Sequence, residues 1–567
     1  MGSANSMGRM RLTLTALGLV AAQAIAASPG DVVDNFRLVD HKGESHELYY
    51  LSDMKAVVLL AQGNGCKASN DAAVALQALR AKYQSQGVEF LSINSNPGDS
   101  REAVAAEASK AGIELPVLVD ELQLVGESLG LRNNGEVLVV NPQGWKVAYH
   151  GASSAVGEAL DAVVSGAPVK TAVTKVVGCA IRMPERDNRA AHARISYEKT
   201  IAPMLADKCV TCHRTGGIGP WQMTSYQMVK GFAPMIREVV RTERMPPWHA
   251  DPHYGAFSND RSLTNEQAKA LVHWIESGAP RGVGKDPLLE MKKDWPEWQL
   301  GKPDLVVAMP AFTVPATGVI PYQMVKVANT LDHDVWVRAI DFLPGERTVL
   351  HHIIASVGGE QRGGTSLSNY VPGAVPLQIP TDNGILLPKG TTFHFQMHYT
   401  PSGKELTDVT RMGLYFMKDA PKYNYRSSVF INPRLKIPAN TKAHVETATQ
   451  TFKRDVLIFS LHPHSHFRGR AASFVAHYPD GREEMLLNVP RYDFNWQSTY
   501  ELTQPKVLPA GTKVVYTTVF DNSTQNKANP DPNRVVPWGE QTWDEMVFGV
   551  IRYRNLVEDT AVASAGE

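Results

Sequence analysis

The chain has 567 residues, which is enough for roughly three to five domains. Its 57 basic and 57 acidic side chains give a formal net charge of +0, which argues against nucleic-acid binding because such proteins normally carry a basic excess. A hydrophobic content of 43% and a charged content of 20% are typical of packed globular domains and argue against a disordered chain.

Residues 1–26 have the features of a secretory signal peptide. Arg9 and Arg11 precede an apolar run that ends in the small-residue sequence Ala24-Ile25-Ala26. An uncleaved membrane anchor is the alternative, but the run is short for a full span. We therefore expect a periplasmic or secreted bacterial protein with no stable membrane span after signal cleavage, in an oxidising compartment.

Residues 29–167 alternate between strand-like and helix-like stretches. The runs "AVVLLAQG", "VEFLSINSN" and "EVLVVNPQG" are separated by segments with helical periodicity that end at glycine. This alternation predicts an α/β domain with a largely parallel sheet. A linker is expected over 168–193, and its Cys179 is a possible disulfide partner of Cys66.

Residues 194–285 are predicted to form an all-α, cytochrome c-like domain, and they contain the sequence "CVTCH". Two thiols at this spacing attach a c-type haem, and the adjacent histidine ligates its iron, so Cys209, Cys212 and His213 are the predicted haem-binding residues. A structural disulfide or a partial zinc site is the alternative. Met245, which precedes two prolines, is favoured as the sixth iron ligand, with Met223 and His249 as rivals.

From about residue 300, short strand-like runs separated by Pro, Gly, Asn and Asp predict two tandem all-β sandwiches, over 300–420 and 421–556. Three histidine-rich motifs lie in this region: "LHHIIAS", "HFQMHYT" and "LHPHSHF". Adjacent histidines on a strand point to opposite faces, so both can bind one metal only at a strand end or a bulge. Imidazole together with the thioether of Met546, expected inside the last strand, favours copper.

Taken together, the His-His pair, "QMHYT", "HSHFRGR" and "EMVFGVIRY" resemble the copper type II, ascorbate-dependent monooxygenases, the family of peptidylglycine α-hydroxylating and dopamine β-monooxygenases. The resemblance covers about residues 300–556. It implies two jelly-roll-like sandwiches, each with one copper ion, separated by a solvent-filled cleft. It also implies that His351, His352 and His398 hold an electron-transfer copper, and that His464, His466 and Met546 hold the oxygen-activating copper.

The chain departs from this family in two respects. The positions that bind the substrate carboxylate in the peptide hydroxylase correspond here to His462, Phe548 and Val550, which argues against a peptidylglycine substrate. His462 and Gln396 are nevertheless candidate substrate-facing residues. The disulfides of the animal enzymes have no counterpart either, because no cysteine follows Cys212.

The N-terminal domain resembles the thioredoxin-like, peroxiredoxin-related fold, with Cys66 in "AQGNGCKASN" at the position of the redox cysteine. A helix N-terminus lowers a thiol's pKa, which would make Cys66 nucleophilic. Ser69, however, replaces the second cysteine of a Cys-x-x-Cys pair. A structural or docking role is therefore favoured over a retained thiol role.

The sequence as a whole predicts an exported copper-dependent monooxygenase that hydroxylates a C–H bond with O2. Its cofactors would be two copper ions and one covalent haem c, and its substrate a small molecule or a peptide. Electrons would come from an external donor, ascorbate or a redox protein, through the haem. The alternatives are a non-enzymatic periplasmic copper-binding or electron-transfer protein, and a peroxidase centred on Cys66.

Overall fold

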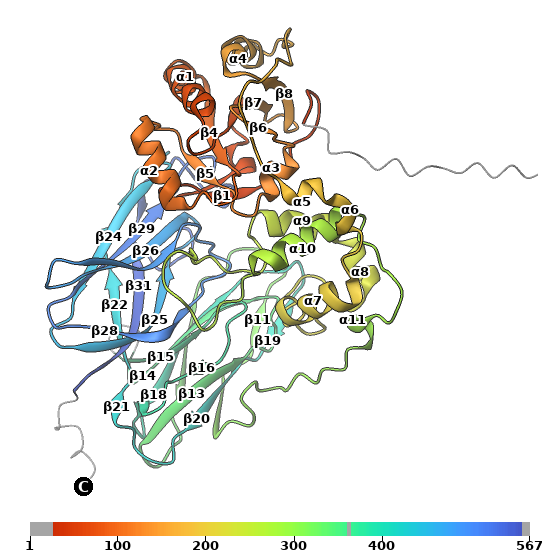
Figure 1. Cartoon of the computed structure of the whole chain (residues 1–567). Helices are drawn as coiled ribbons and strands as arrows, with labels where there is room; N and C mark the ends of the chain where they lie inside the picture. Colours follow the sequence, from red (N-terminus) through yellow and green to blue (C-terminus); the bar gives the residue numbers. More distant parts are fainter. Residues whose placement is uncertain (1–26, 360–363, 558–567) are drawn as a thin grey trace, which may run out of the picture.

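The computed structural model describes residues 27–359 and 364–557, so the predicted signal peptide lies outside the described residues. Within these ranges no helix has both the length and the apolar character needed to cross a bilayer. Figure 1 shows the N-terminal α/β domain, in red and orange, above a helical segment in yellow and green and two β regions in green-cyan and blue.

The N-terminal domain is built around a five-stranded sheet whose strands follow the apolar runs of the sequence. Alternate residues of the fully buried central strand enter two separate cores, one on each face of the sheet. The strands, in spatial order, are β5 (Val117–Val119), β4 (Val88–Asn94), β3 (Ala56–Ala61), β7 (Val137–Asn141) and β8 (Lys146–Gly151). The helices are α1 (Lys67–Tyr83), α2 (Arg101–Ala111), α3 (Leu124–Ser128) and α4 (Val156–Ser165).

The prediction of an α/β domain is confirmed, but the prediction of a largely parallel sheet is wrong. β3, β4 and β5 are parallel, whereas β7 is antiparallel to both β3 and β8. A short turn with Gly144 at φ 86° joins β7 to β8, and strands joined by so short a turn pair antiparallel.

The stretch 168–193, predicted as a linker, packs onto this domain. Its strand β9 (Cys179–Ala180) pairs with β6 (Asn133–Asn134). Ile181 and Met183 are buried in the N-terminal core. Two short helices follow, α5 (Pro184–Asp187) and α6 (Arg189–His192).

The helical segment has a core of its own, with Trp274 fully buried at its centre. Its longest helix, α10 (Asn265–Glu276), begins at a capping box between Thr264 and Gln267. The other elements are the π-helical turn η4 (Tyr197–Ile201), α7 (Ala202–Lys208), α8 (Tyr226–Gly231), α9 (Ala233–Arg241) and α11 (Pro287–Glu290). The loop between α9 and α10 leaves this core, and its Trp248 enters the core of the second β region.

The first β region has two main sheets that share one hydrophobic core. One sheet consists of β10 (Leu305–Ala308), β20 (Arg411–Phe416), β13 (Val335–Leu343), β17 (Asn383–Leu387) and β21 (Tyr423–Asn424), with β16 (Leu377–Gln378) beside β13. The other consists of β12 (Gln323–Ala328), β18 (Thr392–Tyr399), β14 (Leu350–Val357) and β15 (Thr365–Tyr370). A small pair is formed by β11 (Phe312–Val314) and β19 (Leu406–Asp408).

The second β region has two four-stranded sheets around another core. One consists of β22 (Arg426–Ile431), β31 (Phe548–Asn555), β25 (Val456–His464) and β28 (Tyr500–Leu508). The other consists of β24 (His444–Thr451), β29 (Lys513–Phe520), β26 (Gly469–His477) and β27 (Glu483–Val489). Phe459 of β25 is buried in the core of the first region, so the two regions are packed directly against each other.

Candidate functional site

His351, His352 and His398 come together where β14 pairs with β18. Alternate residues of β18 enter the core, so His398 and Gln396 lie on the opposite face of the strand. On β14, an irregular register between Leu350 and His352 breaks the alternation, which lets adjacent histidines approach one point. The ring centroid of His398 lies 5.0 Å from that of each of the other two.

The chemistry of this first cluster fits a metal ion. One ring nitrogen from each histidine lies within 4.8 Å of the other two. The buried Nε2 atoms of His351 and His352 and the Nδ1 atom of His398 have no hydrogen-bond partner. Burial lowers the pKa of His351 to about 4 and that of His398 to about 3, so these rings are neutral at pH 7, the form that binds metals. Buried polar atoms without partners are rare, and a metal ion would satisfy them.

Tyr322 is a neighbour of this cluster that no sequence motif indicated. Its ring centroid lies 4.8 Å from that of His398 and 5.3 Å from that of His352. Its buried hydroxyl has no hydrogen-bond partner, and burial raises its pKa above the ordinary value. The hydroxyl is therefore a protonated donor beside the three imidazoles.

The second cluster begins at the end of β25. The Nδ1 atom of His464 lies 2.5 Å from Oε1 of Gln497, and Nδ1 of His466 lies 3.2 Å from the carbonyl oxygen of Asp544. Both oxygens only accept, so each Nδ1 carries the proton and each Nε2 keeps its lone pair for a metal. The two ring centroids are 5.2 Å apart with the ring planes at 90°.

Glu545 ties the Met546 segment to this turn. Its carboxylate accepts the backbone N–H of His466 at 2.7 Å, that of Arg468 at 2.6 Å and that of Met546 at 3.4 Å. Complete burial raises the pKa of Glu545 to about 8. The prediction that Met546 lies inside the last strand is wrong, because β31 begins at Phe548. Hydrogen bonding by Glu545, rather than strand pairing, thus holds Met546 near His466.

The two candidate substrate-facing residues lie on different β regions. His462 shares a face of β25 with His464, and its Nδ1 atom lies 3.2 Å from the Thr499 hydroxyl. Burial lowers the pKa of His462 to about 3, so the ring is neutral. Gln396 is buried on the His398 side of β18. Of the two, only His462 lies on a strand that ends in the second cluster.

Phe494 lies between the two clusters. Its ring stacks on His351, with centroids 4.5 Å apart, and meets His466 edge-on at 6.1 Å. The resemblance implied a solvent-filled cleft here. Instead, this side chain is 8% exposed and fills the space between His351 and His466.

The "CVTCH" motif follows α7. Cys209 is the C-cap residue of that helix, and its carbonyl accepts the N–H groups of Cys212 and His213. Both cysteines are free thiols, and burial raises the pKa of Cys209 to about 12. The Nδ1–H of His213 donates to the carbonyl of Trp221 at 3.0 Å, which leaves Nε2 free. Two thiols and an imidazole with a free Nε2 on one turn fit a covalently attached haem.

The three candidates for the sixth iron ligand lie in two places. Met245 and His249 line a cavity of about 250 Å³ at the junction of the N-terminal domain, the helical segment and the second β region. Cys209, Cys212 and His213 are not among its lining residues. Met223 is buried in the helical core against which Cys209 packs, and its N–H donates to the His213 carbonyl at 2.9 Å. Met245 as sixth ligand stays a prediction.

Cys66 and Cys179 form a disulfide. Cys66 is the N-cap residue of α1 and is 3% exposed, and Cys179 reaches it from β9. Ser69, at the place of a second thiol, is fully buried and donates its hydroxyl proton to the Cys66 carbonyl at 3.0 Å. In this state the N-terminal domain has no free thiol, because the bridge uses its only two cysteines.

Residues 29–150 match the model of the AhpC/TSA family. No curated protein matches the chain. A hypothetical protein of Sinorhizobium meliloti 1021 is 25% identical, over 28% of this chain and 95% of its own, with a TM-score of 0.26. Peroxidoxin BcpB of Mycobacterium tuberculosis is 18% identical, over 24% of this chain and 95% of its own, with a TM-score of 0.21. Residues 29–150 therefore form a thioredoxin-like domain of the AhpC/TSA type, joined to a mostly β C-terminal region.

Proposed function

We propose that this protein is an exported, copper-dependent monooxygenase that receives electrons through a covalently bound haem c. The observation that carries the proposal is the pair of histidine clusters on adjoining β regions. The first offers three converging imidazoles whose buried nitrogens have no partners. The second offers two Nε2 lone pairs oriented by Gln497 and Asp544, and the backbone N–H groups of His466 and Met546 share one oxygen of Glu545.

The ligand sets of the two clusters differ, as expected if one copper ion transfers electrons and the other activates O2. Three neutral imidazoles suit a centre that only passes electrons, whereas two imidazoles and a weak thioether leave a coordination position open. Bound copper would supply the one-electron chemistry that activates O2. One O2, one C–H bond, two electrons and two protons then yield one alcohol and one water.

Protein side chains would control access to these centres. The ring of Phe494 and the packed β regions would limit the access of bulk water to the clusters. Half-buried, neutral His462 is the nearest strand neighbour of His464 on the same face, and we assign it to substrate contact. The helical segment, tethered to the copper module, would keep the reductant at a high effective concentration. The thioredoxin-like domain, with Cys66 held in the disulfide, would serve as a docking platform.

The proposal is tested by copper analysis and O2 consumption on the reduced full chain. We expect two copper ions per chain and O2 uptake stimulated by a C–H substrate. His398→Ala should lose one copper ion, whereas His394→Ala, on the same strand and face, should keep both. Met546→Ala should abolish substrate-stimulated uptake and Met485→Ala, in the same β region, should not. Two bound copper ions without uptake for any candidate substrate would favour the alternative of a non-enzymatic copper protein, which the burial of four of the five cluster histidines also suits.

A further inference from the structure

One loop touches both histidine clusters and the helical segment. This loop, residues 490–499, connects β27 to β28 and is called the bridging loop below. Its two ends and its middle contact three different parts of the molecule.

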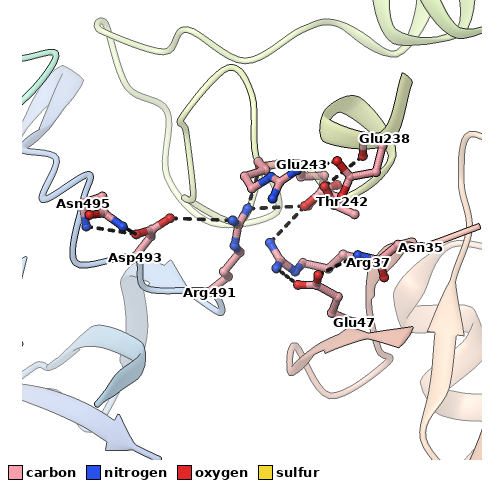
Figure 2. Close-up of polar contacts among 10 residues, drawn as sticks. Asn35, Arg37, Glu47, Glu238, Thr242, Glu243, Arg491, Asp493 and Asn495 are labelled. Atoms are coloured by element: carbon pink, nitrogen blue, oxygen red, sulfur yellow. Dashed lines mark hydrogen bonds and ion pairs between the residues drawn. The ribbon is translucent and has the colours of Figure 1, made fainter. Parts of the chain in front are cut away.

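Arg491 fastens the start of the bridging loop to the end of α9. Its Nη1 atom donates to the carbonyl of Glu243 at 2.8 Å and to that of Thr242 at 3.3 Å. The Thr242 carbonyl also accepts a hydrogen bond from Nη1 of Arg37, in the N-terminal domain, at 2.9 Å. Figure 2 shows the guanidinium groups of Arg491 and Arg37 side by side at the Thr242 carbonyl, although the two side chains come from different parts of the molecule. The helix C-terminus is the negative end of the helix dipole and favours such cations.

The loop is also braced internally. Asp493 accepts the backbone N–H of Asn495 at 2.9 Å and its side-chain amide at 3.0 Å, and lies 3.8 Å from Arg491 (Figure 2). The Tyr492 hydroxyl donates to the Ser465 carbonyl at 2.7 Å and accepts the Ser465 N–H at 3.0 Å. Ser465 stands between His464 and His466. Tyr492 therefore holds the turn that presents both histidines.

The remaining contacts reach the rings of the clusters themselves. Phe494 stacks on His351 of the first β region and its ring meets that of His466 of the second edge-on. Gln497 accepts a hydrogen bond from Nδ1 of His464. His351 and His466 belong to two β regions, each built around its own hydrophobic core. Their separation depends on what is packed between them, and the closely packed ring of Phe494 is there.

We propose that Phe494 is a positioning residue that sets the separation of the two imidazole clusters, and that Arg491 holds it in place by hydrogen bonds to the helical segment. This inference rests on the proposed function, since the separation matters only if both clusters bind copper. Removing the ring would leave a void at the contact between the β regions, and the surroundings would relax into it. A small change in this contact would alter the distance between the two bound ions.

The test uses the full chain loaded with Cu(II). Electron paramagnetic resonance reports magnetic dipolar coupling between two Cu(II) ions, which falls with the cube of their distance. Phe494→Ala should keep two copper ions per chain but change the coupling by about a third or more, which corresponds to a change of about a tenth in the separation. The matched control is Phe452→Ala, a ring of similar burial in the same core that contacts Tyr553 rather than a histidine. It should lose comparable stability and leave the coupling unchanged.

The anchor is tested in the same way. Arg491→Ala should change the coupling in the same direction as Phe494→Ala, whereas Arg37→Ala, which removes a donor to the same Thr242 carbonyl, should not. Phe494→Leu, which keeps much of the apolar volume, is the variant to use if Phe494→Ala does not fold. Fewer than two copper ions in the unmodified chain would contradict the proposed function. Two copper ions in both Phe494 variants, with the coupling of the unmodified chain, would overturn this inference alone.

Discussion

The amide oxygen of Gln497 lies 2.5 Å from Nδ1 of His464, and both residues are buried. This contact fixes the tautomer of His464, because the amide oxygen accepts only from a protonated Nδ1. The Nε2 lone pair is thereby directed to the metal position. An outer partner of this kind orients a ligating ring and increases its basicity.

Gln497→Leu should therefore weaken copper binding at the second cluster, by about 10- to 100-fold in affinity. The first cluster does not contact Gln497 and should keep its copper ion. Competition with a copper chelator, followed through the Cu(II) spectrum, measures both sites. Gln450→Leu is the control, because Gln450 lies in the same β region and donates to the Val429 carbonyl far from the histidines. Equal affinities for the two variants would contradict the orienting role.

The haem proposal predicts the result of removing the thiols. Cys209→Ala/Cys212→Ala should abolish covalent haem, measured as the pyridine haemochrome absorbance of the denatured protein. The copper content should not change, because the motif and the histidine clusters have separate cores. Covalent haem that persists in the double variant would refute the assignment.

His213→Ala distinguishes attachment from ligation in the same motif. The thiols would still be present, so covalent haem is expected at a reduced level and with an altered absorption spectrum. Met245→Ala and Met223→Ala then identify the sixth ligand, since only loss of the true ligand should lower the reduction potential. If neither variant moved the potential, His249 would become the leading candidate.

The disulfide between Cys66 and Cys179 predicts a loss of stability rather than of activity. The bridge closes a loop with a sequence separation of 113 residues, so Cys179→Ser should lower the free energy of unfolding of the N-terminal domain by about 2 to 5 kcal/mol. Chemical denaturation followed by circular dichroism measures this change. Cys66→Ser should have the same effect, and the double variant should add nothing. Peroxide turnover that depended on Cys66 would instead support the peroxidase alternative.

Features that depend on local sequence were predictable in this chain. The apolar runs of β3, β4 and β7, the capped helix α10 and the "CVTCH" turn each carry their signal within a few residues. The need for a strand end or a bulge at His351-His352 was also predictable, because strand alternation forbids two adjacent side chains on one face. The types of the residues and the spacing of apolar positions along the chain suffice for such inferences.

Features that depend on distant packing were not predictable. Phe494, Gln497 and Tyr322 contact the histidines from loops that no motif marks. Phe494 also fills a space that the family resemblance leaves open, and a single aromatic residue in a loop gives no sign of where its ring lies. The place of Met546 beside His466 depends on Glu545, a buried carboxylate whose three backbone partners come from two segments.

Asp251 and Arg101 form a pH-dependent contact between the helical segment and the N-terminal domain. Asp251, in the loop after α9, accepts from Arg101 of α2 at 2.6 Å and from Asn488 of β27 at 3.0 Å. Burial alone would raise the pKa of Asp251, but the hydrogen bond and charge of Arg101 lower it below its ordinary value. A carboxyl with a depressed pKa stabilises the folded state above its unfolded pKa, and this contribution is lost as the pH falls through the folded pKa.

Asp251→Asn should thus lower the free energy of unfolding by about 3 to 5 kcal/mol at pH 7, because it leaves a buried guanidinium without its counter-charge. The difference from the unmodified chain should shrink as the pH falls below the ordinary pKa of an aspartate, where Asp251 itself becomes protonated. Urea denaturation at a series of pH values measures this convergence. Asp71→Asn, which breaks an exposed pair with Lys67, should cost less than about 1 kcal/mol at every pH. A difference for Asp251→Asn that stays constant down to the acid limit would show that its charge does not stabilise the junction.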